Sequence, residues 1–113
     1  MVLSLVSSML LAACGSGVPA PNDRLASAEG ATRSAHELDA ESDPQAALHL
    51  KLANEQIEKA KAAMKNEENK QADMLLQRAS ADAELAVQLA KGAKAKAEAQ
   101  QAVDRANALR GGK

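Results

Sequence analysis

The sequence contains no phenylalanine, tyrosine or tryptophan, and it has a single cysteine in 113 residues. A chain with one cysteine cannot form an internal disulfide, which excludes a disulfide framework as a source of stability. Hydrophobic residues make up 46% of the chain, and alanine supplies a large part of that share. The few larger aliphatic side chains cannot wall off a cavity for a substrate. We therefore expect one small domain of modest stability that binds no small-molecule substrate.

The motifs of common catalytic sites are missing as well. The chain has no glycine-rich phosphate loop, no nucleophile elbow and no H-E-x-x-H zinc motif. The only histidines are His36 and His49, each on a predicted helix without further metal ligands at a suitable spacing. Glu67 and Glu68 are better explained as acidic residues at a helix start than as a catalytic pair, because acidic side chains interact favourably with the helix dipole at that end. The sequence thus predicts no enzyme activity, no metal and no cofactor.

Charge is distributed unevenly, although the net charge is only −1. A value so close to zero argues against general binding of nucleic acid. Residues 23–43 hold two basic and six acidic side chains, a balance of −4, and residues 91–113 hold six basic and two acidic ones, a balance of +4. Such segments can pair within one fold, or the basic end can face an anionic surface. Internal pairing and solvation is the simpler interpretation.

The first 13 residues are predicted to be a signal peptide. Residues 2–13 are apolar or small apart from serines, and no Lys or Arg precedes them. As a helix they would reach about 18 Å at about 1.5 Å per residue, against about 30 Å for the hydrocarbon core of a bilayer. The run is therefore too short to span a membrane, as in secretion signals.

Leu11, Ala12, Ala13 and Cys14 resemble the lipobox of bacterial lipoproteins. The resemblance implies cleavage before Cys14 and acylation of that cysteine, for example with palmitate. The alternative is an unmodified cysteine in a short apolar helix. Two or three acyl chains would attach the protein stably to a membrane. Gly15 follows where Asp would favour retention in the inner membrane, so we expect a protein of the bacterial envelope, anchored to the outer membrane and facing the periplasm.

The remaining sequence predicts an all-α fold. Residues 14–22 are expected to form the lipidated end and a flexible tether, residues 23–110 an Ala-rich helical domain, and residues 111–113 a tail. Helices are predicted over about 23–40, 44–65 and from about 70 to 110, and Ser42 and Asp43 before Pro44 provide the cap for the second. Asn66 suits a left-handed position at the end of that helix.

The second and third predicted helices share one apolar rhythm. Small and aliphatic residues follow steps of four and three, as one buried face requires: Ala46, Leu50, Ala53, Ile57, Ala60 and Met64, then Ala72, Leu76, Ala79, Ala83, Ala86, Ala90, Ala93 and Ala97. Only residues 66–69 separate the two helices, so we expect an antiparallel hairpin. Beyond Gly92 the apolar face drifts to Ala95, Ala99, Ala102, Ala106 and Leu109, and the long third helix bends there or continues.

The position of the first helix, whose apolar face comprises Leu25, Ala28, Thr32, Ala35 and Leu38, is less constrained. It can lie beside the hairpin or against the basic end of the third helix. The opposite charges favour the basic end.

The third helix also carries a family resemblance. Ala72, Leu75-Leu76, Ala79 and the segment Asp82-Ala83-Glu84-Leu85-Ala86 resemble the bacterial domain of unknown function DUF4398 over about residues 25–91. The turn of that family usually carries a Gly-Asp-aromatic sequence, whereas this chain has Glu67, Glu68 and Asn69. The resemblance implies a helical envelope lipoprotein, and it implies no activity.

The basic end supplies the candidate contacts with an anionic partner, namely Lys91, Lys94, Lys96, Arg105, Arg110 and Lys113. A solvated helix end that suits the helix dipole is the simpler interpretation, and anionic lipid, cell-wall polymer or an acidic protein is the alternative. Lys113 also resembles the terminal lysine of murein lipoprotein, which is joined to peptidoglycan.

Three hypotheses of function follow. The first is a structural or scaffolding lipoprotein that binds itself or a partner through its Ala/Leu face. The second is a peptidoglycan tether, and the third is an accessory subunit of an envelope complex.

Overall fold

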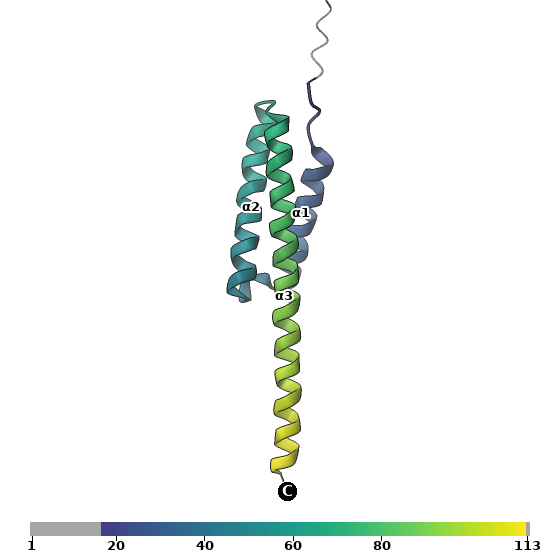
Figure 1. The fold of residues 1–113 in the computed structure, drawn as a ribbon, viewed down its shortest axis with the longest axis vertical. Helices are drawn as coiled ribbons and strands as arrows, with labels where there is room; N and C mark the ends of the chain where they lie inside the picture. Colours follow the sequence, from purple (N-terminus) through teal and green to yellow (C-terminus); the bar gives the residue numbers. More distant parts are fainter. Residues whose placement is uncertain (1–16, 113) are drawn as a thin grey trace, which may run out of the picture.

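The computed structural model describes residues 17–112, which form three α-helices, one short 3₁₀ helix and no strand (Figure 1). The elements are α1 (Asn22–Glu37), η1 (Ala40–Ser42), α2 (Pro44–Lys65) and α3 (Asn69–Gly111). The predicted all-α class with a long C-terminal helix is confirmed. The predicted signal peptide, the lipobox residues Leu11 to Ala13, Cys14 and Lys113 lie outside the described residues.

Helices α2 and α3 form the predicted antiparallel hairpin (Figure 1). The residues of the four-three pattern are buried as far as Ala90, except that Met64 is half-buried and Ala63 takes its place in the core. The last two members of the pattern are not buried, because Ala93 is half-buried and Ala97 is exposed. Among residues 17–112 most of the buried side chains are alanines, and Leu76 is the only large side chain with no exposed surface. Alanine seams let helix axes approach to about 8 Å, the low end of the usual range. The hairpin is therefore held by close contact along its length rather than by bulky side chains.

Helix α1 lies beside the hairpin and runs in the same direction as α3 (Figure 1). Its buried Ala28 packs in one cluster with Ile57 and Leu76, and its buried Ala35 packs in another with Leu50 and Ala86. The favoured position against the basic end of the third helix is therefore wrong. Burial of apolar side chains decides the position, because attraction between exposed charges is weak and screened.

Two ion pairs tie α1 to the hairpin. Arg24 pairs with Asp73 of α3, and the Nζ atom of Lys61 on α2 lies 2.9 Å from an Oε1 atom of Glu29. Hydrogen bonds to Glu29 and then to Glu58 raise the pKa of the Lys61 ammonium above its ordinary value. Lys61 is thus charged throughout the neutral range, and its contribution to stability is lost only when alkaline pH passes that raised pKa.

The first helix ends at Glu37, three residues before the predicted end. Asp39 adopts a left-handed conformation with φ 57°, and the hydroxyl of Ser42 donates to its backbone oxygen at 2.7 Å and to its carboxylate at 2.8 Å. Short polar side chains such as Asp tolerate this conformation because they hydrogen-bond locally. Asp43 then caps α2 as predicted, and its carboxylate accepts from the backbone N–H of Gln45 and Ala46.

The turn between α2 and α3 puts a glutamate where glycine is usual. Glu67 has φ 61°, and the N–H of Glu68 donates to the oxygen of Ala63 at 2.9 Å. This is the bond pattern of a Schellman motif, with Glu67 in the left-handed position expected for Asn66. Glu68 occupies the N-cap of α3, but its side chain makes no capping hydrogen bond.

Replacing Leu76 should unfold the body more readily than any other single truncation. Leu76→Ala is expected to cost about 3 kcal/mol, because a fully buried leucine loses its contacts and leaves a void. Urea unfolding followed by circular dichroism measures the change. Met74→Ala, two residues earlier on the same helix and 57% exposed, is the control and should cost less than about 1 kcal/mol. Equal losses in the two variants would contradict this core.

Glycine at position 67 should stabilise the fold. Glu67→Gly removes a left-handed strain of about 1–2 kcal/mol, and part of this gain is lost to the greater freedom of glycine in the unfolded chain. The expected net gain is about 0.5–1 kcal/mol in the same unfolding assay. Glu68→Gly is the matched control, because Glu68 has an ordinary φ of −82°, and that variant should be neutral or less stable. A loss of stability in both variants would show that strain at Glu67 is negligible.

Candidate functional surfaces

Helix α3 continues far beyond the part that packs against its neighbours. Ala90 is its last buried residue, and we call residues 91–111 the arm and residues 22–90 the body. Every arm residue is exposed except the half-buried Ala93, and beyond Ala97 no other described element lies beside the arm (Figure 1). Of the two expected outcomes at Gly92, continuation is the one observed. At about 1.5 Å per residue, the arm projects about 30 Å from the body.

The arm carries the predicted basic residues, all of them exposed. Within residues 17–112 these are Lys91, Lys94, Lys96, Arg105 and Arg110, and none of them makes an ion pair. Arg105 donates one hydrogen bond, to the side chain of Gln101 at 3.4 Å. The arm has five basic and two acidic residues, a balance of +3, whereas the body has eight basic and thirteen acidic residues, a balance of −5. The structure therefore brings these residues together on one exposed helix and separates them from most of the acidic side chains.

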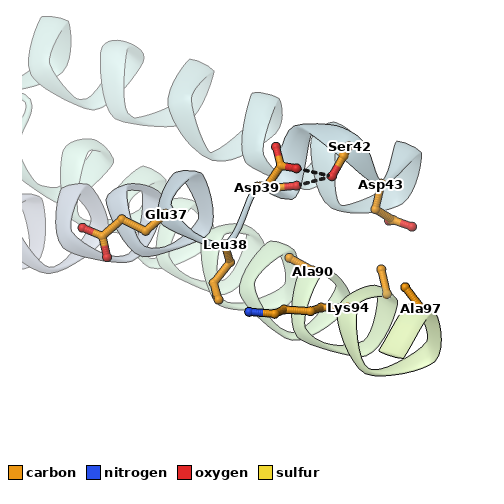
Figure 2. Close-up of a pocket in the computed structure, with 9 residues that line it drawn as sticks. Glu37, Leu38, Asp39, Ser42, Asp43, Ala90, Lys94 and Ala97 are labelled. Carbon is orange, nitrogen blue, oxygen red and sulfur yellow. Dashed lines mark hydrogen bonds between the residues drawn. The ribbon is translucent and has the colours of Figure 1, made fainter. Parts of the chain in front are cut away.

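A hollow of about 420 Å³ marks the junction of arm and body (Figure 2). Asp39 and Asp43 lie on one side of this hollow, and Ala90, Lys94 and Ala97 of α3 lie on the other (Figure 2). Asp39 is already held by Ser42, and Asp43 caps α2. Asp39 and Asp43 thus stabilise the local path of the chain at this open hollow.

A second open hollow follows the line between α1 and α3, and we call it the α1–α3 groove. Small and apolar side chains form most of its walls, and Glu84 is its one charged residue: Ala31, Ser34, Ala81, Glu84, Leu85, Val87 and Gln88. Leu85 is 41% exposed there, so an apolar surface is left partly uncovered at the end of the body nearest the arm.

The two histidines take part in polar contacts that the sequence analysis did not predict. His49 Nδ1 lies 2.8 Å from Asp82 Oδ1, and the side-chain amide of Gln56 donates to Asp82 Oδ2 at 2.7 Å. These half-buried groups join α2 to α3, and His36 pairs with Glu41 near the end of α1. Asp82 lies seven residues from both Leu75 and Leu89, and this spacing was the signal that it flanks the seam with α2. Within residues 17–112 no three potential metal ligands gather in one place.

None of the described helices has a stretch both long enough and apolar enough to cross a bilayer. No curated protein and no solved structure matches the chain. A family model does match: the model described as domain of unknown function DUF4398 aligns with residues 23–109. That range takes in all but the first residue of α1, the whole hairpin and nearly all of the arm, so the arm is part of the family's domain. The chain belongs to the DUF4398 family.

Proposed function

We propose that this protein is a lipoprotein of the bacterial envelope, acylated on Cys14, with a non-enzymatic role in scaffolding or protein interaction. The observation that carries the proposal is the sequence Leu11-Ala12-Ala13-Cys14 directly after a short apolar run. The acyl chains anchor the protein to a membrane, residues 15–21 form a tether, and the helical body and arm stand in the periplasm at the outer membrane. No cofactor is required.

The shape of the body supports a role without catalysis. The hollows described above are open, and in the first of them Asp39 is bonded to Ser42 and Asp43 caps α2. A catalytic site needs a pocket in which reacting groups are held near each other and shielded from water. The core of this body consists mostly of closely packed alanines and leaves no room for such a pocket.

The arm supports a role in interaction. It consists of about six turns of helix in which only Ala93 is even half-buried, whereas most of the stability of helices in proteins comes from tertiary packing of one face. A partner that packs against the arm would supply the missing burial. The exposed basic side chains and the exposed Leu109 provide polar and apolar contacts for it.

A peptidoglycan tether is the second candidate, because the exposed arm projects about 30 Å from the body and Lys113 follows the arm in the sequence. If Lys113 is joined to peptidoglycan, lysozyme digestion of purified sacculi should release the protein with a muropeptide on the Lys113 amine. Complete extraction of the protein by detergent before digestion would contradict the tether.

The anchor is tested at Cys14. Cys14→Ala is expected to abolish labelling by radioactive palmitate, to leave the precursor uncleaved and to change its fractionation, because the thiol that accepts the lipid is lost. Labelling of cells, followed by gel electrophoresis and mass spectrometry of the N-terminus, measures these effects. Ser16→Ala, two residues after Cys14, is the matched control and should be labelled normally. Equal labelling of Cys14→Ala and the natural chain, or a processed chain that begins at another residue, would contradict the proposal.

A further inference from the structure

The arm has a continuous apolar stripe on the side turned away from the hollow at its base. Its members follow steps of three and four along one side of the helix: Gly92, Ala95, Ala99, Ala102, Ala106 and Leu109. Leu109 is 79% exposed, and Val103, beside the stripe, is 52% exposed. Towards the body the same spacing continues through Gln88 and Leu85, which line the α1–α3 groove. One track of small and apolar residues, interrupted by Gln88, therefore runs from that groove to the tip of the arm; we call it the track.

The distribution of charge indicates which kind of partner can pack against this track. The arm has a balance of +3 and the body one of −5, and the groove at the start of the track has Glu84 and no basic residue. Within one copy the arm cannot reach the groove, because α3 is a single helix that leads away from the body. A second copy offers the complementary charge if its arm points towards this body. Electrostatic attraction of this kind favours one orientation of two partners over the other.

We propose that two copies of this chain form an antiparallel dimer in which each arm packs along α3 of the partner and its tip enters the partner's α1–α3 groove. The spacing sets the register. When Leu109 lies opposite Leu85 of the other copy, Ala106 lies opposite Gln88, Ala102 opposite Gly92 and Ala99 opposite Ala95. The small residues of the stripe let the two helices approach closely, and Ala31 and Ser34 leave room for the tip in the groove.

The size of the contact fits a reversible dimer. From residue 85 to residue 109 the track is about 36 Å long at about 1.5 Å per residue. Two alanine-rich helices in contact over that length bury about 1,000 Å² in total, which is the lower limit for a specific interface. Attachment of both copies to one membrane would raise their effective concentration and favour pairing. The dimer deepens the interaction role proposed above, but it does not depend on acylation of Cys14.

Self-association is measured with the full chain in a mild non-ionic detergent. The chain carries Cys14→Ala, because this substitution removes the acyl chains and any association through them. We expect a monomer–dimer equilibrium in sedimentation equilibrium. Ala102→Glu should weaken dimerisation by about tenfold or more, which corresponds to about 1.4 kcal/mol, because it buries an unpaired charge in the seam. Ala108→Glu is the matched control: it places the same charge on the opposite side of the arm, and it should change the constant by less than about threefold. Circular dichroism should show equal helix content in both variants.

Orientation is tested by cysteine cross-linking in the same background. Leu85→Cys and Leu109→Cys chains are mixed and oxidised, and the antiparallel register predicts a disulfide between the two different chains. A parallel pair would instead join each variant to itself.

Three results would overturn the dimer. The first is a monomer at all concentrations up to about 100 µM, the range of weak association, and the second is an equal loss of dimer in Ala102→Glu and Ala108→Glu. The third is a monomer that binds vesicles of phosphatidylglycerol and loses that binding equally in both variants, which would make the arm an electrostatic contact for lipid. Loss of acylation at Cys14 would overturn the proposed anchor and leave these results unchanged.

Discussion

The close packing of alanine against alanine between α2 and α3 is the contact on which the rest of the structure depends. With Leu76 as the one fully buried leucine in the described part of the chain, and with no aromatic side chain in the sequence, the hairpin gains little apolar burial from any single residue. It compensates by length, because small side chains repeat along the whole seam and bring the two helices close together. Helix α1 adds two further alanines to the same interior. A fold of this kind does not tolerate a large side chain in place of an alanine in its seam. Such a side chain would push the two helices apart, and many small contacts would be lost at once.

The hairpin could be predicted from the sequence because its signal is repeated many times. Steps of four and three continue through both helices, and one break of four residues divides them. The position of α1 could not be predicted in the same way. The opposite charges of residues 23–43 and 91–113 suggested that α1 packs against the basic end of α3. Ala28 and Ala35 instead require the hairpin as their neighbour, and burial of these alanines determines the packing. Exposed charges act weakly over distance, whereas an alanine without exposed surface must have a neighbour.

Chain reversals were predicted less accurately than helices. The end of α1 depends on Asp39 in a left-handed conformation, and the turn after α2 depends on Glu67 in the same region. Asn66 was the more obvious residue for that conformation, but the register of the helix end places Glu67 at the position where the chain must turn. Pairing between His49 and Asp82 was also missed, because it joins residues 33 positions apart. The exposure of the basic residues Lys91, Lys94, Lys96, Arg105 and Arg110 could be expected from the sequence, since exposure of a charged helix end requires no tertiary information. That the arm lacks a neighbour became visible only in the structure.

The direction of α1 has a consequence for how the molecule stands on a surface. Because α1 runs parallel to α3, the chain enters the body at the end opposite the arm (Figure 1). An attachment shortly before Asn22 would therefore hold the body at its base and leave the tip of α3 as the most distant point, about 65 Å from the start of that helix. A single copy would act as an upright post. Two copies paired in antiparallel orientation would have their attachment points at opposite ends. The pair would lie flat along one surface or bridge the gap between two facing surfaces.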